Sequence, residues 1–353
     1  MTVVSADGGV ATDAALRRRP ILWILVLAGL TIAVSVVAVA VGAVAVPVES
    51  VVEVIAHRLA GTSSEMPTED AVVWLIRLPR VIVGVCVGIA LSIAGVAIQA
   101  IVRNPLADPY LIGVSPGATT GAAASILFGI GGAWGGFALT GSAFVGAVVA
   151  IALVFALARV GGRLVSARVV FAGIAVGFAL TAVTNLLVFL SDSRDGVRAV
   201  MFWMLGSLAR ADWSQVPLLT SVTALCAVAL WSCARGLDTI AIGDDTARSL
   251  GTDPTRFRGI VLVIAAVAVA AAVAVSGMIG FIGLVVPHLA RRLVGARHVV
   301  VLPTAALLGA VVTVAADAVA RTVAAPREVP LGILTALLGT PLLILLVRRS
   351  LAR

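Results

Sequence analysis

The stretch that decides the fold is residues 77–117, RLPRVIVGVCVGIALSIAGVAIQAIVRNPLADPYLIGVSPG. It begins with two arginines around Leu78-Pro79 and continues as an uncharged apolar run. At a rise of about 1.5 Å per residue, about twenty apolar residues cross the hydrocarbon core of a bilayer. The run ends in a polar turn, residues 103–109, with two prolines, an asparagine and an aspartate. Because such a turn leaves backbone groups without internal hydrogen bonds, we expect it at an aqueous interface or in a cavity walled by protein.

The composition is that of a polytopic membrane protein. Of 353 residues, 61% are hydrophobic and 12% are charged, whereas a soluble domain is about 45–50% apolar and about a quarter charged. The 25 basic residues are all arginine and lie mostly between apolar runs, so the net charge of +8 does not indicate a nucleic-acid partner. The absence of lysine excludes a Walker A loop. The cysteines show no metal-ligand spacing and are expected to be buried apolar residues: Cys86, Cys226 and Cys233.

Apolar runs predict about ten membrane-spanning helices in one transmembrane domain, residues 21–349. Residues 1–20 are expected to form a cytoplasmic tail, because the apolar run after it is too long for a cleaved signal peptide. The run at 279–294 is short and follows a glycine-rich approach, which favours a broken or re-entrant segment. The ten runs lie near residues 21–46, 81–102, 111–129, 137–158, 168–190, 213–233, 259–276, 279–294, 301–320 and 331–347.

The distribution of arginine predicts the orientation. With the N-terminus in the cytoplasm, 17 arginines fall in inner segments and 8 in outer segments. This distribution agrees with the positive-inside rule. We therefore expect both termini in the cytoplasm, which agrees with an even number of spans.

Polar residues inside the apolar runs are the remaining functional candidates, because the sequence lacks enzyme motifs such as HExxH. Gln99 lies near the inner end of the second run. Thr181 and Asn185 lie one helical turn apart in the fifth. Asp317 and Arg321 have the spacing of a local ion pair in the ninth.

The longest inner segment, residues 234–258, indicates a compact cytoplasmic structure. Asp244 or Asp245 is suited to cap a short helix that ends at Gly251. Asp253 is suited to cap a second helix with Pro254 at its first position. Two short helices joined at a glycine suggest a site where a cytoplasmic protein docks.

These motifs together resemble those of the FecCD-type permeases, the transmembrane subunits of ABC importers for iron–siderophore complexes, haem and cobalamin. The similarity extends from Arg77 to Arg349. It rests on RLPR (77–80), NPLADPYLIGVSPGA (104–118), FAGIAVG (171–177), FWMLGSL (202–208), ARSLG (247–251), GFIGLVVPHLARRLVG (280–295) and REVPLGILTALLGTPLLILLVRR (327–349).

The resemblance implies an all-α ABC type II importer permease fold with about ten transmembrane helices per subunit. It also implies roles for matching residues. Those implied to couple to the ATPase are Asp244, Asp245, Arg248, Leu250 and Gly251. Those implied to dock the acidic groups of a substrate-binding protein are Arg77, Arg80 and Arg321. Those implied to form the gate and translocation path are Gln99, Asn104, Leu106, Gly161 and Gly162.

The resemblance implies partners as well. The permease would work as a homodimer, or with a paired homologous permease, in the bacterial cytoplasmic (inner) membrane. Two ATP-binding subunits would bind ATP and magnesium, so that this chain would need no cofactor and would not be an enzyme. An extracytoplasmic substrate-binding protein would deliver the cargo, and membrane lipid would surround the spans.

Ferric siderophore is the expected substrate, with cobalamin or haem as the alternatives within the same transporter type. A secondary transporter that needs no ATPase is a more distant alternative. It would need intramembrane carboxylates for ion coupling, and only Asp317 lies well inside a run. An intramembrane enzyme or a structural scaffold is the remaining class.

Overall fold

The computed structural model describes residues 8–42, 46–61, 67–160, 163–164 and 166–351. The regular secondary structure of the described residues is helical apart from one hairpin, in which β1 (Arg159–Val160) pairs antiparallel with β2 (Arg163–Leu164). This confirms the predicted all-α class. The helices are α1 (Gly8–Ala40), α2 (Val48–Ala60), α3 (Pro67–Asp70), η1 (Ala71–Arg77), α4 (Leu78–Val102), η2 (Pro109–Ile112), α5 (Val114–Phe128), η3 (Gly132–Phe137), α6 (Ala138–Ala158), α7 (Ser166–Phe189), α8 (Arg194–Met204), α9 (Val216–Ser232), α10 (Ala234–Ile242), α11 (Asp244–Ser249), α12 (Pro254–Ser276), α13 (Ile282–Val294), α14 (His298–Thr322) and α15 (Leu331–Leu351).

Each of the ten predicted apolar runs coincides with a helix. Within the described residues, six helices are long and apolar enough to cross a membrane, and the pair α9 and α10, bent by 55°, makes a seventh. The other three runs correspond to α5, α13 and α15, whose apolar parts are shorter. The prediction of about ten spans is therefore roughly consistent with the structure.

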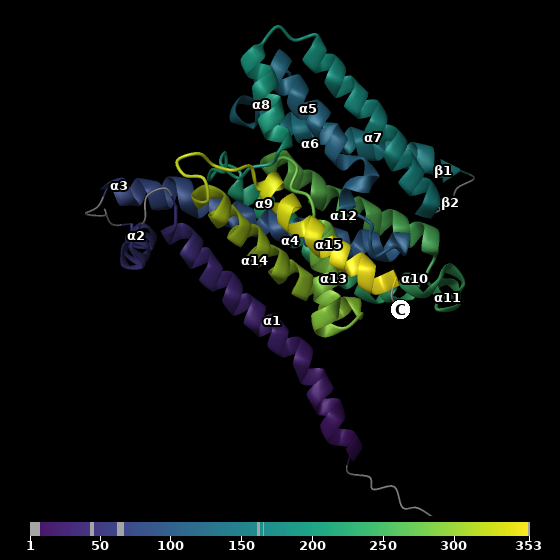
Figure 1. Cartoon of the computed structure of the whole chain (residues 1–353). Coiled ribbons are helices and arrows are strands. Elements are labelled where there is room, and N and C mark those ends of the chain that lie inside the picture. Colours follow the sequence, from purple (N-terminus) through teal and green to yellow (C-terminus); the bar gives the residue numbers. More distant parts are fainter. Residues whose placement is uncertain (1–7, 43–45, 62–66, 161–162, 165, 352–353) are drawn as a thin grey trace, which may run out of the picture.

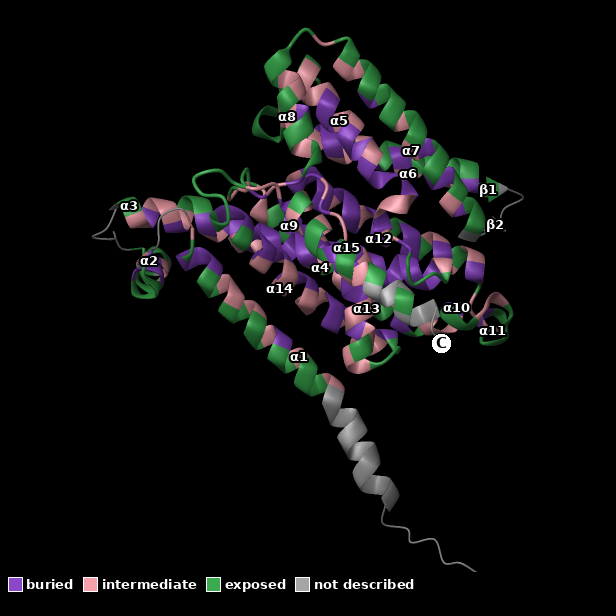
Figure 2. Ribbon diagram, in the orientation of Figure 1, coloured by how far each residue is buried: buried purple, intermediate pink, exposed green. Residues whose placement is uncertain are grey.

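Helix α4 is the centre of the molecule (Figure 1). It packs against α9, α12, α13 and α14, and its apolar window is 83% buried. A helix that is apolar on all sides suits a protein core or a membrane, and α4 lies in the protein core. By contrast, α1 is buried over only 11% of its window and α7 over 28%, and Figure 2 shows both largely exposed.

Glycines set how closely these helices approach, since lipid tails supply no hydrophobic force between helices and packing decides their association. A Cβ at Gly88 of α4 would lie 2.3 Å from the carbonyl oxygen of Gly309 in α14. In the layer formed by α5, α6 and α7, a Cβ at Gly117 would lie 2.4 Å from the carbonyl oxygen of Gly146. These glycines therefore allow close packing of helices within one subunit.

The segment between α12 and α13 is broken, as its glycines indicated. Gly277 has a φ of +66°, and a Cβ there would lie 2.2 Å from the carbonyl oxygen of Trp203. The hydroxyl of Tyr110 accepts a hydrogen bond from the amide of Ile279 (3.2 Å) and donates one to its carbonyl (3.0 Å). The irregular backbone thus finds partners inside the protein, which is the condition for such a segment at membrane depth.

Candidate functional site

The predicted site residues lie at two opposite ends of the helical bundle. One end carries α2 and α3, and the other carries α10, α11 and the β1–β2 hairpin (Figure 1). We call them the α2 end and the α11 end. Helix α4 joins them, because it begins next to η1 and finishes beside α10.

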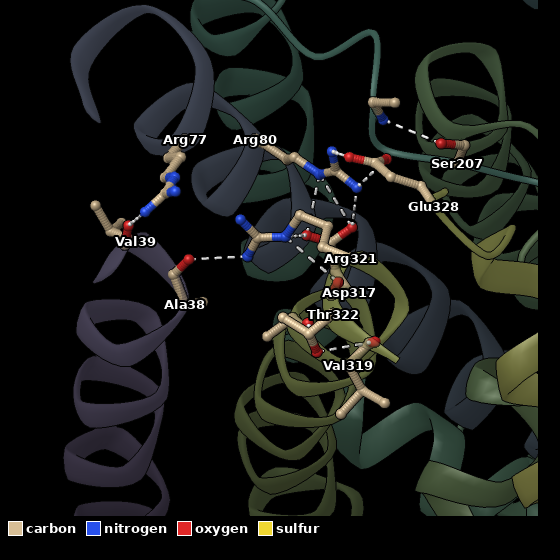
Figure 3. Close-up of polar contacts among 12 residues, drawn as sticks. Ala38, Val39, Arg77, Arg80, Ser207, Asp317, Val319, Arg321, Thr322 and Glu328 are labelled. Carbon is tan, nitrogen blue, oxygen red and sulfur yellow. Dashed lines mark hydrogen bonds and ion pairs between the residues drawn. The ribbon is translucent and has the colours of Figure 1, made fainter. Parts of the chain in front are cut away.

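At the α2 end, Arg80 is held between two carboxylates (Figure 3). Its Nε and Nη2 donate to Asp317 at 2.9–3.1 Å, and its Nη1 and Nη2 donate to Glu328 at 3.0 Å each. The side chains of Arg80 and Asp317 are 7% and 3% exposed, whereas that of Glu328 is 42% exposed. The guanidinium is thus satisfied from within the chain, with its solvent-facing side taken by Glu328.

The other two arginines predicted to dock a partner hold the end of α1. The last carbonyl groups of a helix have no partner within it. Arg77 donates to the carbonyls of Val39 and Ala40 (2.8 Å each), and Arg321 donates to that of Ala38 (2.8 Å). These arginines place positive charge where the α1 dipole is negative.

Arg321 also makes the ion pair that its spacing indicated, with 3.1 Å between its Nε and Oδ2 of Asp317. Within the chain, Arg321 therefore contacts both Asp317 and the end of α1. All three arginines are buried, so the docking role stays a prediction. Sequence analysis did not single out Glu328, although it follows Arg327 within the REVPLG motif.

At the α11 end, the predicted gate turn is a compact loop that follows α4. The side-chain oxygen of Asn104 accepts from the amide of Leu106 (2.9 Å), and the Asn104 amide donates to the carbonyl of Gln99 (3.1 Å). Leu106 is 45% exposed. Gln99 itself is buried and donates to the carbonyl of Leu284 (3.2 Å), while Arg291 donates to its side-chain oxygen. The other predicted gate residues, Gly161 and Gly162, lie outside the described residues.

The N-terminal cap of the predicted coupling segment differs from the one that the sequence predicted. Neither Asp244 nor Asp245 caps α11: the N-cap residue is Gly243, and Asp244 lies in the first turn and binds arginines. The rest agrees with the sequence. Gly251 has a φ of +83°, and the carboxylate of Asp253 accepts from the first amides of α12.

Helix α11 has an exposed face and a face turned toward the chain. Asp245 is fully exposed and pairs with Arg248 at 2.8 Å, three residues on. Leu250 is 63% exposed. The Asp244 carboxylate instead lies against Arg258, and the hydrogen bond from Arg258 keeps the pKa of Asp244 below its ordinary range. An exposed polar face with a projecting leucine suits contact with another protein.

A cavity of about 470 Å³ contains the two polar residues that the sequence placed in the fifth run. Thr181 and Asn185 of α7 line it together with Asp108 and Ser115. The hydroxyl of Ser115 is buried and has no described hydrogen-bond partner. Polar side chains at this depth are typical of a cavity rather than a lipid-facing surface.

The fold resembles that of a known transporter over most of its length. A metal-chelate type ABC transporter in an inward-facing conformation matches 92% of this chain and 98% of its own, with a TM-score of 0.81 and 31% identity. A cobalamin import system permease of Halobacterium salinarum is 38% identical over 80% of this chain and 74% of its own. A hemin transport system permease of Yersinia pestis is 41% identical over 80% of this chain and 86% of its own.

The helical membrane domain and these similarities define the permease subunit of an ABC importer, a transport subunit and not an enzyme. The profile of the FecCD transport family matches residues 30–349. The chain therefore belongs to the FecCD transport family, which the motifs of the sequence indicated.

Proposed function

We propose that this chain is the permease subunit of an ATP-driven importer that moves a ferric siderophore across the cytoplasmic membrane. The supporting observation is the fold similarity to a metal-chelate transporter over 92% of the chain. Cobalamin and haem are the alternative cargoes, and the names of the two permeases above favour them equally.

The proposed orientation puts the α11 end in the cytoplasm, with both termini on that side. Two ATP-binding subunits bind ATP and magnesium, and this chain holds no cofactor. The exposed face of α11, with Asp245, Arg248 and Leu250, meets the ATP-binding subunit, and Gly251 ends the helix. A closing movement of the ATPase then reaches the permease through this helix.

The proposed path lies between two permease copies, a homodimer or a pair of homologous chains. The turn at Asn104 and Leu106 closes it on the cytoplasmic side, with Gln99 behind the turn. Gly161 and Gly162, which lie outside the described residues, are the proposed second element of the gate. Bulky apolar side chains exposed on α7 suit contact with the second copy or with lipid: Phe171, Phe178 and Phe189.

The α2 end is the proposed docking face for the substrate-binding protein. Because Arg77 and Arg321 hold α1, Arg80 is the arginine best placed to exchange partners. An acidic group of the binding protein would replace Glu328, the more exposed of its two carboxylates. Complementary charges of this kind set orientation and association rate more than affinity.

The experiment that tests the proposed function is uptake by cells with and without the gene. Radiolabelled iron is given as a ferric siderophore, and labelled cobalamin and haem are given in parallel. We expect the deletion to abolish siderophore uptake alone. Loss of cobalamin or haem uptake instead would overturn the proposed cargo. If uptake of all three substrates is unchanged and no ATPase co-purifies with the chain, the proposed importer function is overturned.

A further inference from the structure

Asp244, the first residue of α11, is joined to the chain by two arginines. Arg258 of α12 grips it with both terminal nitrogens, at 2.9 Å from Nη1 to Oδ2 and 2.5 Å from Nη2 to Oδ1. Nη2 of Arg103 lies 3.5 Å from Oδ1. The Arg258 side chain is 6% exposed, whereas Arg103 is 43% exposed.

The same two arginines reach the end of α4 and the gate turn. Nε of Arg258 donates to the carbonyl of Ile101 (3.2 Å), in the last turn of α4. Arg103 is the residue between α4 and Asn104, and its φ of +56° is a left-handed conformation that residues other than glycine adopt infrequently. One carboxylate of α11 is therefore connected through side chains to both sides of the point where α4 ends.

The other polar residues of α11 make no such connection in the described structure. Asp245 and Arg248 pair with each other on the exposed face. Gly251, at the far end of the helix, has nothing within 4 Å of the position a Cβ would take. Among the polar side chains of α11 in the described structure, Asp244 is thus the one with a direct connection to the end of α4 and the gate turn.

We propose that Asp244 is a positioning residue that transmits the movement of α11 to the gate turn through Arg258 and Arg103. The inference rests on the proposed function in that α11 must meet an ATPase. Two parallel hydrogen bonds from one guanidinium fix the angle as well as the distance of a carboxylate. A buried arginine that loses its partner is strongly penalised, so the pair stays together and moves as one body.

The test uses the complete importer, with its ATPase, reconstituted in lipid vesicles. The cysteines Cys86, Cys226 and Cys233 are replaced by alanine, and Leu106→Cys reports on the gate by its reaction with a water-soluble maleimide. Labelling is compared without nucleotide and after trapping with ATP and vanadate, and ATP hydrolysis and transported substrate are measured in the same preparation. All variants are compared within this background.

The decisive variant is Arg258→Lys. Lysine keeps a positive charge beside Asp244 but has no second nitrogen to reach the carbonyl of Ile101. We expect ATP hydrolysis within about twofold of the parent, transport per ATP reduced at least about fivefold, and Leu106→Cys labelling that no longer responds to nucleotide. Asp244→Asn, which keeps the size of the side chain, is the second variant if Arg258→Lys does not accumulate, and the same result is expected.

The matched control is Arg256→Gln, two residues away on the same helix. Its side chain is 86% exposed and pairs only with Asp253 within the described residues, so transport per ATP and the labelling response should stay as in the parent. A normal labelling response in Arg258→Lys or in Asp244→Asn would overturn the inference while leaving the proposed function intact. A parent complex with no ATPase activity and no labelling response would overturn both.

Discussion

Asp317 satisfies two buried arginines, and its removal leaves both short of an acceptor. Breaking a buried ion pair from one side costs about 3–5 kcal/mol, because the remaining charge stays buried. We expect Asp317→Ala to lower the thermal unfolding temperature of the purified permease by several degrees and to reduce its amount in the membrane. The control is Asp195→Asn, because Asp195 and its partner Arg198 are both largely exposed and such pairs contribute about 0–1 kcal/mol. Equal unfolding temperatures for both variants would show that the cluster is not structural.

Glu328 is the side chain that tests docking at Arg80. Charge reversal of Arg77 and Arg80 together would also remove Arg77, one of the two arginines that hold α1, so a loss of uptake would not separate docking from folding. Glu328→Gln leaves Arg80 paired with Asp317. It also removes the negative charge that competes with the binding protein for the side of the Arg80 guanidinium facing Glu328. We expect several-fold tighter binding of the substrate-binding protein to the reconstituted importer, measured by biolayer interferometry at low salt. Glu53→Gln, at an exposed position beside His57, is the control, and unchanged affinity in Glu328→Gln would remove Arg80 from the docking site.

The lowered pKa of Asp244 predicts a pH dependence of stability. A carboxylate whose pKa is lower in the folded state stabilises the fold above its unfolded pKa of about 3.9, and the contribution disappears as pH falls through the folded value. The cause here is the hydrogen bond from Arg258. The stability difference between the parent and Asp244→Asn should therefore be constant from about pH 8 to pH 5 and should shrink below about pH 4. Thermal unfolding in detergent across this range measures it, and a difference that grows on acidification would contradict the assignment.

The sequence predicted the contacts of a charged side chain only where its partner is close in the chain. The i, i+4 spacing identified the Asp317–Arg321 pair, and Asp253 before Pro254 identified the cap of α12. The partners of Arg80 lie 237 and 248 positions away, so no spacing rule reveals them. The same limit explains why Asp244 was expected to cap a helix. Its actual partner, Arg258, lies 14 positions on, and only the turn between α11 and α12 brings the two together.

Among the elements, the contact between α4 and α14 depends on two glycines that face each other. A Cβ at Gly88 would overlap the carbonyl of Gly309, whose own Cβ would lie 2.4 Å from the carbonyl of Gly88. Overpacking of this kind costs about 1–3 kcal/mol. We expect Gly88→Ala to lower the unfolding temperature by several degrees. Gly29→Ala on α1 is the matched control, because nothing lies within 4 Å of its Cβ position and alanine favours a helix by about 1 kcal/mol over glycine; equal effects of the two would contradict tight packing.

Hydropathy predicted the helices well where they are long and uniformly apolar, as in α4, α12 and α14. It did not give the short helix α8, because its residues are mixed and its burial depends on neighbours distant in sequence. It also placed the third span from residue 111, whereas α5 begins at Val114 after η2. The difference arises because Gly113, with a φ of +76°, ends η2 and redirects the chain. The break between α12 and α13 was visible because glycines mark it directly.

Over the whole molecule, α4 connects the two polar clusters. Arg80 lies in its first turn and Ile101 in its last, and 25 helical residues are about 37 Å long. Sites so far apart should affect stability additively, within about 0.5 kcal/mol. Their effects on function need not add, because a buried helix gripped at both ends by arginine networks transmits a displacement as a rigid body.

The double variant Glu328→Gln with Arg258→Lys tests whether the two clusters are independent in stability but coupled in function. We expect its unfolding free energy to equal the sum of the single changes. We also expect the change that Glu328→Gln makes to ATP hydrolysis stimulated by the binding protein to disappear in the Arg258→Lys background, because the signal would no longer pass from α4 to α11. Combining Glu328→Gln with Arg256→Gln should preserve that change. If Glu328→Gln acts equally in both backgrounds, α4 does not carry the signal, and another of the helices that cross the bundle must do so.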